Sequence, residues 1–172
     1  MPSRNEQRSG DAFIYEIVDG PELLVVGLSA RTTNEAEAGP EGVIPGLWRR
    51  FRAGKVSPDL LPLHGSHEVL ATYTEYESDE HGAFTFTLGY RVTNLDQVPE
   101  GLTGAVVPAQ LFARIDVEGS PTQSIPAAWK RIWTAFDDEP YSRRFLADAE
   151  IYTRNETTGI EPSAILIGVN PW

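Results

Sequence analysis

The segment 148–152 carries residue types that are well suited to binding or catalysis. Alternate residues of a β-strand face the same way, so Asp148, Glu150 and Tyr152 are expected to share one face of a strand. If this face is buried, a carboxylate held away from water needs a compensating positive charge or becomes protonated. If it is solvated, the same spacing is typical of an ordinary strand surface. The spacing alone leaves both interpretations open.

A second acidic and aromatic cluster occupies residues 73–77. In an extended strand Tyr73 and Glu75 would share one face, and Tyr76 would lie on the other. Either face could line a binding groove. The alternative is that one tyrosine packs in the core while the acidic side chains meet solvent.

Other familiar catalytic and metal-binding patterns lack support in this sequence. His64 and His67 with Glu68 could meet in a loop, but they do not have the ligand spacing of a recognisable metal site. The sequence contains no His-Glu-x-x-His pattern, phosphate loop, dinucleotide fingerprint or Gly-x-Ser-x-Gly elbow. It also contains no cysteine, which excludes disulfides and thiol catalysis. We therefore expect neither a metal nor a cofactor.

Two related helices are predicted to position the candidate residues. The run 43–51 contains Ile-Pro-x-x-Trp-basic-Arg-apolar, and the pattern recurs at 125–132, with Trp129 following Trp48 by 81 positions. Proline fits the first turn of a helix, and Ser124 is the predicted N-cap of the second helix. Core packing is the ordinary interpretation of the apolar stripe on that helix, formed by Ile125, Ala128, Trp129, Ile132, Trp133 and Phe136.

The remaining chain is predicted to form strands and loops. Strand-forming stretches lie at 13–31 with a turn at 19–21, at 69–76 and 84–93 as a hairpin, at 102–118 with a break at Pro108, at 148–153 and at 164–169. Loops are expected at 34–42, at 55–68 and through Tyr141, Arg143 and Arg144. The order of strand, helix, strand and strand occurs twice. We therefore predict an α+β fold of tandem β-α-β-β units, with an antiparallel-rich sheet, two helices on one face and a ligand groove between the halves.

Length and charge limit the classes of protein to consider. We expect a flexible tail at 1–11 and a single domain at 12–172, made of halves at about 12–98 and 99–172. The sequence has no apolar run of about 18 residues and no apolar N-terminal segment, so we expect a cytoplasmic protein without a membrane span or signal peptide. A net charge of -11 disfavours direct binding to nucleic acid and suits cationic partners. The basic residues at 49–52 and 130–131 are expected to form solvated helix surface.

The order and spacing of six motifs resemble the GyrI-like, or AraC-type, effector-binding domains. The resemblance covers about residues 14–170 and is greatest to the stand-alone branch, which includes an integron-cassette protein that binds cationic drugs. The motifs are Arg31-Thr32-Thr33-Asn34, Ile44-Pro45-x-x-Trp48-x-x-Phe51, Tyr73-x-x-Tyr76-Glu77-Ser78-Asp79, Val107-Pro108-Ala109, Trp129-x-x-Ile132-Trp133 and Asp148-x-Glu150-x-Tyr152.

The resemblance implies a groove that binds amphipathic, often cationic aromatic compounds. In multidrug-responsive relatives a buried glutamate meets the charge of the ligand, and the motif assigns this role to Glu150, with Tyr152 beside it. By their positions in strand and helix, Tyr73, Trp129 and Trp133 would line the groove. Such a domain is often fused to a helix-turn-helix, for which this chain has no room. We therefore expect a drug sensor or sequestering protein, with a transcription regulator or another protein as a potential partner.

Two further hypotheses follow from the same resemblance. Some members resemble hydrolases of reactive cyclopropanoid compounds, in which Glu150 would orient or deprotonate a water molecule with Tyr152 assisting. Other members resemble an inhibitor of DNA gyrase, and the acidic surface would then bind a basic protein partner. The residues alone do not distinguish a carboxylate that pairs with a cation from one that activates water.

Overall fold

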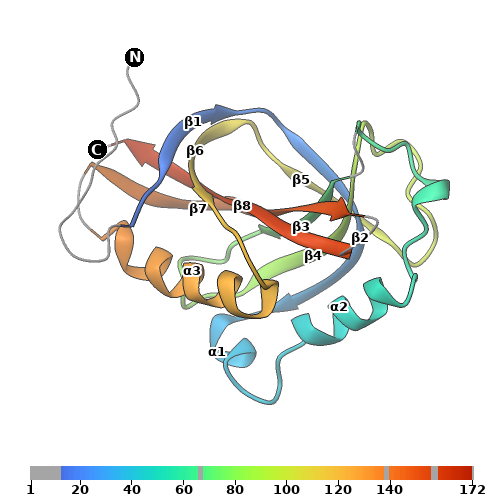
Figure 1. Ribbon diagram of the computed structural model, residues 1–172, viewed down its shortest axis with the longest axis horizontal. Helices are drawn as coiled ribbons and strands as arrows, with labels where there is room; N and C mark the ends of the chain where they lie inside the picture. The colour runs from blue at the N-terminus through green and yellow to red at the C-terminus, as the bar shows by residue number, and fades with distance from the viewer. Residues whose placement is uncertain (1–12, 66–67, 138–139, 156–158, 172) are drawn as a thin grey trace.

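The computed structural model describes residues 13–65, 68–137, 140–155 and 159–171. The tail predicted at 1–11 and the candidate metal ligand His67 lie outside these residues. The described strands form one eight-stranded sheet, in which every pairing is antiparallel and the order is β1-β6-β8-β7-β3-β4-β2-β5 (Figure 1). Their bounds are β1 Glu16–Gly20, β2 Leu23–Thr32, β3 Val69–Thr74, β4 Phe84–Val92, β5 Thr103–Val107, β6 Gln110–Asp116, β7 Tyr141–Asn155 and β8 Gly159–Pro171.

The sheet and its helices are arranged as the predicted tandem repeat. One unit is β2-α2-β3-β4, with α2 at Ile44–Arg52, and the other is β6-α3-β7-β8, with α3 at Pro121–Ala135. The inner strands β3 and β7 pair with each other at the centre of the sheet. At the edges, β1 pairs with β6 and β5 pairs with β2. Each edge strand thus precedes one unit in the chain but pairs with a strand of the other unit. The predicted α+β class and the antiparallel sheet are confirmed.

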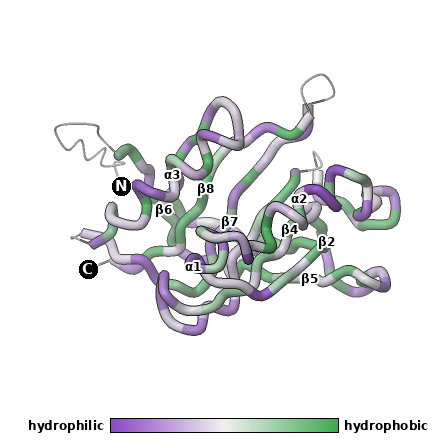
Figure 2. The backbone as a smooth tube through the Cα atoms, turned by 90° about the horizontal axis from the view of Figure 1, so that it is seen from below, coloured by the Kyte–Doolittle hydropathy of each residue, from purple (hydrophilic) through white to green (hydrophobic). Residues whose placement is uncertain are grey.

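Both long helices cover the same face of the sheet. Leu47 and Phe51 of α2 and Ile125 and Ile132 of α3 are buried in one cluster with apolar residues from the strands. A second, smaller cluster of strand residues, which includes Leu70, lies apart from the helices. The sheet therefore has apolar side chains buried on both faces, and Figure 2 shows hydrophobic segments along β2, β4 and β8.

Two glycines allow β2 and β4 to approach closely. Gly27 and Gly89 stand directly opposite each other in this strand pair. A Cβ atom at Gly27 would lie 1.9 Å from the carbonyl oxygen of Leu88, and one at Gly89 would lie equally near that of Val26. Side chains at these positions would force the strands apart, so glycine is required for this pairing.

Three local predictions differ from the structure. Helix α3 begins at Pro121 after the N-cap residue Ser120, so the predicted start at Ser124 is wrong. Pro121, at the first position of the helix, already has a φ angle suited to a helix. The Ser124 hydroxyl instead donates to the carbonyl oxygen of Ser120 at 2.8 Å. The loop expected at 34–42 contains the short helix α1 (Asn34–Glu37), because Thr33 caps it by accepting the N–H of Ala36.

The second half differs most where strand β7 begins. The loop expected through 141–144 is already part of β7, which starts at Tyr141 and shifts register between Arg143 and Asp148. Phe145, within this shift, has a φ angle of 53°. A bulge of this kind interrupts the alternation of side chains, which is the signal that identifies strands in a sequence.

Among the described helices, none is long and apolar enough to cross a membrane.

Candidate functional site

The central strand pair brings the candidate residues of the two halves together. Ala71 of β3 lies opposite Glu150 of β7, and Tyr73 lies opposite Asp148. Tyr73 and Tyr152 both belong to the cluster on the helix-covered face. Their side chains therefore point from the sheet towards α2 and α3.

Glu150 is the acceptor of three hydrogen bonds in this interior. Its side chain is 3% exposed, and its Oε2 atom accepts hydrogen bonds from the Tyr73 hydroxyl and from Trp129 Nε1, the latter at 2.8 Å. Its Oε1 atom accepts from the Tyr152 hydroxyl at 2.5 Å. The structure thus joins Glu150, Tyr152, Tyr73 and Trp129 in one cluster.

Burial determines the protonation properties of this cluster. Burial raises the pKa of Glu150, and the hydrogen bonds from Tyr152, Tyr73 and Trp129 offset this increase only in part. The pKa values of Tyr73 and Tyr152 lie well above the ordinary value, first because of burial and then because of the charge of Glu150. Both tyrosines therefore remain neutral hydrogen-bond donors at physiological pH.

The internal repeat extends to the aromatic partners of Glu150. Trp129 of α3 packs on Tyr73 of β3, with the ring centroids 4.9 Å apart, and Trp48 of α2 packs on Tyr152 of β7 at the same separation. Each helix therefore provides a tryptophan to a tyrosine of the opposite half. The two tyrosines are 79 positions apart, and the residue 79 positions before Glu150 is Ala71. Glu150 therefore accepts hydrogen bonds from both copies of the aromatic pair, from Tyr73 and Trp129 of one and from Tyr152 of the other.

An aromatic cavity lies beside Tyr73 and Trp129. Its volume is about 200 Å³, and it lies between α3, the beginning of α2 and the β3–β4 connection. Glu150 is not among the lining residues, but it accepts hydrogen bonds from the polar groups at the ring edges of Tyr73 and Trp129. The aromatic lining residues are Tyr73, Tyr76, Phe84, Trp129 and Trp133, and the charged ones are Glu37, Glu80, Lys130 and Arg143.

Two residues of α3, Trp133 and Lys130, line the cavity. Trp133 is 44% exposed, so the core interpretation of the apolar stripe does not hold for it; the family resemblance instead placed it in the groove lining. Lys130 is exposed, as expected for helix surface, and also lines the cavity.

Tyr76 lines the same cavity as Tyr73, although the simple alternation of a strand places them on opposite faces. Strand β3 ends at Thr74, and Glu75 has a φ angle of 51°, which interrupts the extended conformation and the alternation of side chains. The carboxylate of Glu75 accepts a hydrogen bond from the Thr85 hydroxyl at 2.7 Å. The predicted grouping of Tyr73 with Glu75 is therefore wrong.

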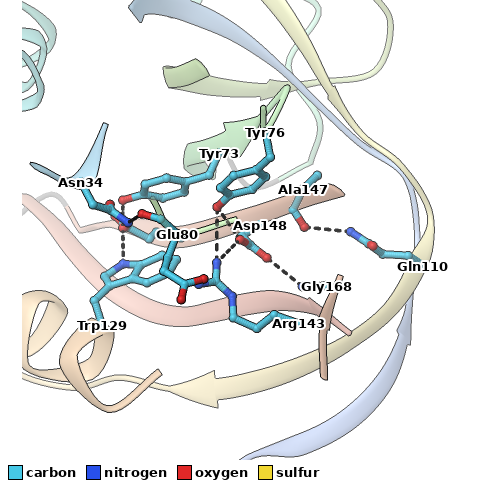
Figure 3. Close-up of polar contacts among 11 residues, drawn as sticks. Asn34, Tyr73, Tyr76, Glu80, Gln110, Trp129, Arg143, Ala147, Asp148 and Gly168 are labelled. Atoms are coloured by element: carbon cyan, nitrogen blue, oxygen red, sulfur yellow. Dashed lines mark hydrogen bonds and ion pairs between the residues drawn. The ribbon is translucent and has the colours of Figure 1, made fainter. Parts of the chain in front are cut away.

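A buried ion pair forms the wall next to Tyr76. Asp148 is fully buried and accepts hydrogen bonds from the Tyr76 hydroxyl at 2.6 Å, Arg143 Nη2 at 2.9 Å and the Gly168 N–H at 2.9 Å (Figure 3). Burial lowers the pKa of Arg143, but the attraction and hydrogen bond of Asp148, together with smaller contributions from Tyr76 and Glu80, raise it overall. The guanidinium lies 4.3 Å from the ring centroid of Phe145. The positive charge that a buried Asp148 requires therefore comes from the chain itself.

Sequence reasoning did not select Arg143 as a site residue. It precedes Asp148 by five positions, across the register shift of β7, so neither strand nor helix periodicity connects them. The same reasoning missed Glu37 and Glu80, which come from the α1 region and the β3–β4 connection. No periodic pattern in the sequence indicates which cavity the side chain of such an acidic residue will line.

The two acidic side chains of the lining differ in their contacts. The Glu37 carboxylate accepts hydrogen bonds from the N–H groups of Val43 and Ile44 at 2.8 and 3.2 Å, and from the Thr32 hydroxyl at 2.7 Å. It thereby caps the beginning of α2, whose N-cap residue Val43 has no capping side chain. The Glu80 side chain is 39% exposed at the cavity mouth.

The fold and the aromatic cavity define this protein as an effector-binding domain. The profile of the Cass2 family, described as integron-associated effector binding protein, matches residues 16–166. The chain therefore belongs to the Cass2 family, and the predicted resemblance to the stand-alone effector-binding domains is confirmed.

Relatives of known sequence or structure agree with this assignment. YobU of Bacillus subtilis (strain 168), which is named as a transcriptional regulator protein, is 32% identical over 130 residues, covering 75% of this chain and 80% of YobU. The integron cassette protein VCH_CASS2 of Vibrio cholerae has a TM-score of 0.74 and 25% identity, covering 91% of this chain and 95% of VCH_CASS2. SAV2435, solved bound to tetraphenylphosphonium, shares the fold with a TM-score of 0.70 at 16% identity, covering 91% and 93% of the two chains.

Proposed function

We propose that this protein binds amphipathic aromatic cations in the aromatic cavity and acts as a drug sensor or sequestering protein. Membership of an effector-binding family supports binding of a small molecule. SAV2435, which has the same fold, was solved with the lipophilic cation tetraphenylphosphonium.

The observation that carries the proposal is the hydrogen bonding of two cavity rings to a buried carboxylate. Tyr73 and Trp129 line the cavity and donate hydrogen bonds to Glu150, which does not line it. These bonds draw negative charge towards the rings, and the ring faces attract a cation. A cation over such a face gains about 0.5–2 kcal/mol, more where water is excluded. Neither interaction needs a particular hydrogen-bonding pattern, which favours broad specificity.

The other copy of the repeat supports the same class of ligand. There the guanidinium of Arg52 lies 5.2 Å from the ring centroid of Trp48, the equivalent of Trp129. The position 81 residues after Arg52 is Trp133, an exposed and uncharged residue at the cavity. At Trp129 the guanidinium of Arg143 lies 5.7 Å from the ring centroid, so the chain places one of its own cations near the tryptophan of each copy.

The hydrolase hypothesis has no comparable support. Both carboxylate oxygens of Glu150 already accept hydrogen bonds from protein donors, and Glu150 does not line the cavity. A general base must reach the proton that it removes. Turnover of cyclopropanoid compounds and binding to a basic protein partner therefore remain hypotheses from the resemblance alone.

A variant that closes the cavity with its own cation tests the proposal. We expect wild-type protein to bind tetraphenylphosphonium more tightly than the neutral triphenylphosphine oxide in isothermal titration calorimetry. Trp133→Arg should reduce the affinity for the cation at least about tenfold, since a guanidinium at this position repeats the arrangement of Arg52 and repels the ligand. Trp133→Gln, which removes the ring without adding charge, should lose less.

A second variant removes the charge of Glu150. Glu150→Gln should weaken binding of tetraphenylphosphonium by about tenfold and leave triphenylphosphine oxide nearly unchanged, because only the cation senses the lost charge. Equal losses for both compounds would reject charge pairing by Glu150. Equal affinity of wild-type protein for the two compounds would reject the cation preference itself.

A further inference from the structure

The cavity is too small to enclose a bulky aromatic cation. Its volume is about 200 Å³, and in another protein an engineered cavity of about 150 Å³ holds a single benzene molecule. One ring of a ligand can therefore enter beside Tyr73 and Trp129. The remainder of the ligand, including a charge attached to that ring, stays at the mouth near Trp133, which is exposed.

Glu150 does not line the cavity and therefore does not contact such a charge directly. Its two oxygens are occupied by Tyr73, Trp129 and Tyr152. A charge at the mouth is instead met by the side chains of the rim. An acidic rim residue can contact a cation held there directly but is screened by solvent, whereas Glu150 acts on the cation from a distance through the less polar interior.

Of the two acidic side chains that line the cavity, Glu80 is the one suited to this contact. Glu37 is engaged with the beginning of α2 and with Thr32. The Glu80 carboxylate has a contact of 3.7 Å with Nε2 of His81, a side chain that is 85% exposed. Because this contact is long and exposed to solvent, breaking it costs little free energy.

The chain around Glu80 is held in place while its carboxylate stays accessible. Asn34 Nδ2 donates to the backbone carbonyl of Glu80 at 2.9 Å, and the next N–H, of His81, donates to Asp79 Oδ1 at 2.9 Å. Figure 3 shows Glu80 between Asn34 and Arg143. A fixed backbone with an accessible carboxylate suits ligands of different shapes.

The basic side chains of the rim do not cancel this acidic site. Arg143 forms its ion pair with Asp148, which balances its charge inside the protein; Glu80 also attracts Arg143, but the described residues show no ion pair between the two. Lys130 is exposed, and its flexible stem allows the ammonium group to remain in solvent. The local balance at the mouth therefore leaves Glu80 as a partner for an added cation.

We propose that Glu80 selects for positive charge, and that the preferred ligands carry a cationic group on the outer end of an aromatic ring. This inference rests on the proposed function, and it assigns the contact with the charge to the rim. Binding then places the ring in the aromatic cavity and a quaternary ammonium or phosphonium group beside the Glu80 carboxylate.

A pair of ligands and a pair of variants test the role of Glu80. The ligands are (4-phenylbenzyl)trimethylammonium and the neutral 4-phenylbenzyl alcohol, measured by isothermal titration calorimetry with wild-type protein, Glu80→Gln and Glu77→Gln. Glu77 is an exposed acid of the same connection and does not line the cavity, so it controls for the loss of one negative charge. Circular dichroism checks that each variant is folded.

We expect Glu80→Gln to weaken binding of the cation about two- to fivefold, as for a partly exposed ion pair, and to leave binding of the alcohol unchanged. The loss should shrink at high salt, which screens exposed charges. Glu77→Gln should match wild type. The role of Glu80 is rejected if Glu80→Gln binds the cation as tightly as wild type, or if both variants lose the same affinity for it. In either case, a preference of the wild type for the cation still supports the proposed function. Equal wild-type affinity for both ligands would reject both.

Discussion

Substitution of Glu150 separates the effect of its hydrogen bonds from that of its charge. In Glu150→Leu the hydroxyls of Tyr73 and Tyr152 and the indole N–H of Trp129 all lose their acceptor. Each buried donor without a partner costs at least about 1 kcal/mol, so the free energy of unfolding should fall by about 3 kcal/mol. In a chain of 172 residues this corresponds to a Tm lower by about 6–12 °C.

Glu150→Gln should preserve these contacts. The amide oxygen can accept from Tyr73 and Trp129, while the amide nitrogen donates to the Tyr152 hydroxyl, which changes from donor to acceptor. We expect the free energy of unfolding at neutral pH to stay within about 1 kcal/mol of wild type. The comparison with Glu150→Leu then measures the value of the hydrogen-bond acceptor alone.

Wild type and Glu150→Gln should also differ in how the free energy of unfolding depends on pH. Burial raises the pKa of Glu150 in the folded protein, so between its ordinary pKa and this raised value the folded state binds more protons than the unfolded state. The stability that Glu150 contributes is therefore complete at acid pH and is lost as the pH rises through this range. Glu150→Gln lacks this loss, so its stability relative to wild type should increase as the pH rises.

Urea denaturation at a series of pH values, followed by far-UV circular dichroism, measures all three proteins. The reasoning would be refuted if Glu150→Leu were as stable as wild type. It would also fail if Glu150→Gln were destabilised as much as Glu150→Leu, because the charge itself would then be required to hold the cluster together.

Three further substitutions test how the site is supported. Gly27→Ala should lower the free energy of unfolding by at least about 2 kcal/mol, because its Cβ atom would lie 1.9 Å from the Leu88 carbonyl oxygen; urea denaturation measures this, and a neutral result would contradict the close strand approach. Asp148→Ala should cost about 3–5 kcal/mol by leaving Arg143 charged and buried without its partner, and adding Arg143→Met should recover part of the loss in the same assay. Glu37→Ala should cost about 1 kcal/mol and accelerate hydrogen exchange in the first turn of α2; unchanged exchange would argue against its capping role.

The fold could be predicted from the sequence because its signals are local and occur twice. The Ile-Pro-x-x-Trp pattern marks both helices at one offset, and alternating apolar residues mark the strands of each half. The short antiparallel connections then leave few arrangements of the sheet. The same regularity did not locate the beginning of α3, where Ser120 and Ser124 are both suitable caps.

The site was harder to predict from the sequence because its geometry depends on departures from regular secondary structure. The positive φ angle of Glu75 brings Tyr76 to the cavity, and the register shift of β7 brings Arg143 to Asp148. Neither feature follows from residue type, since an L-residue other than glycine rarely adopts such an angle. The family resemblance had already selected Glu150 and Trp129, but their hydrogen bond needs the packing of α3 on the sheet.

The location of a bound cation is the most direct test of ligand binding in the aromatic cavity. Tetraphenylarsonium has the shape of tetraphenylphosphonium, and its arsenic atom can be located by anomalous scattering in a crystal of the complex. We expect one phenyl ring against Tyr73 and Trp129, with the arsenic peak at the cavity mouth near Glu80 and Trp133. An arsenic peak elsewhere on the protein, or a cavity that stays empty at saturating cation, would contradict binding at this site.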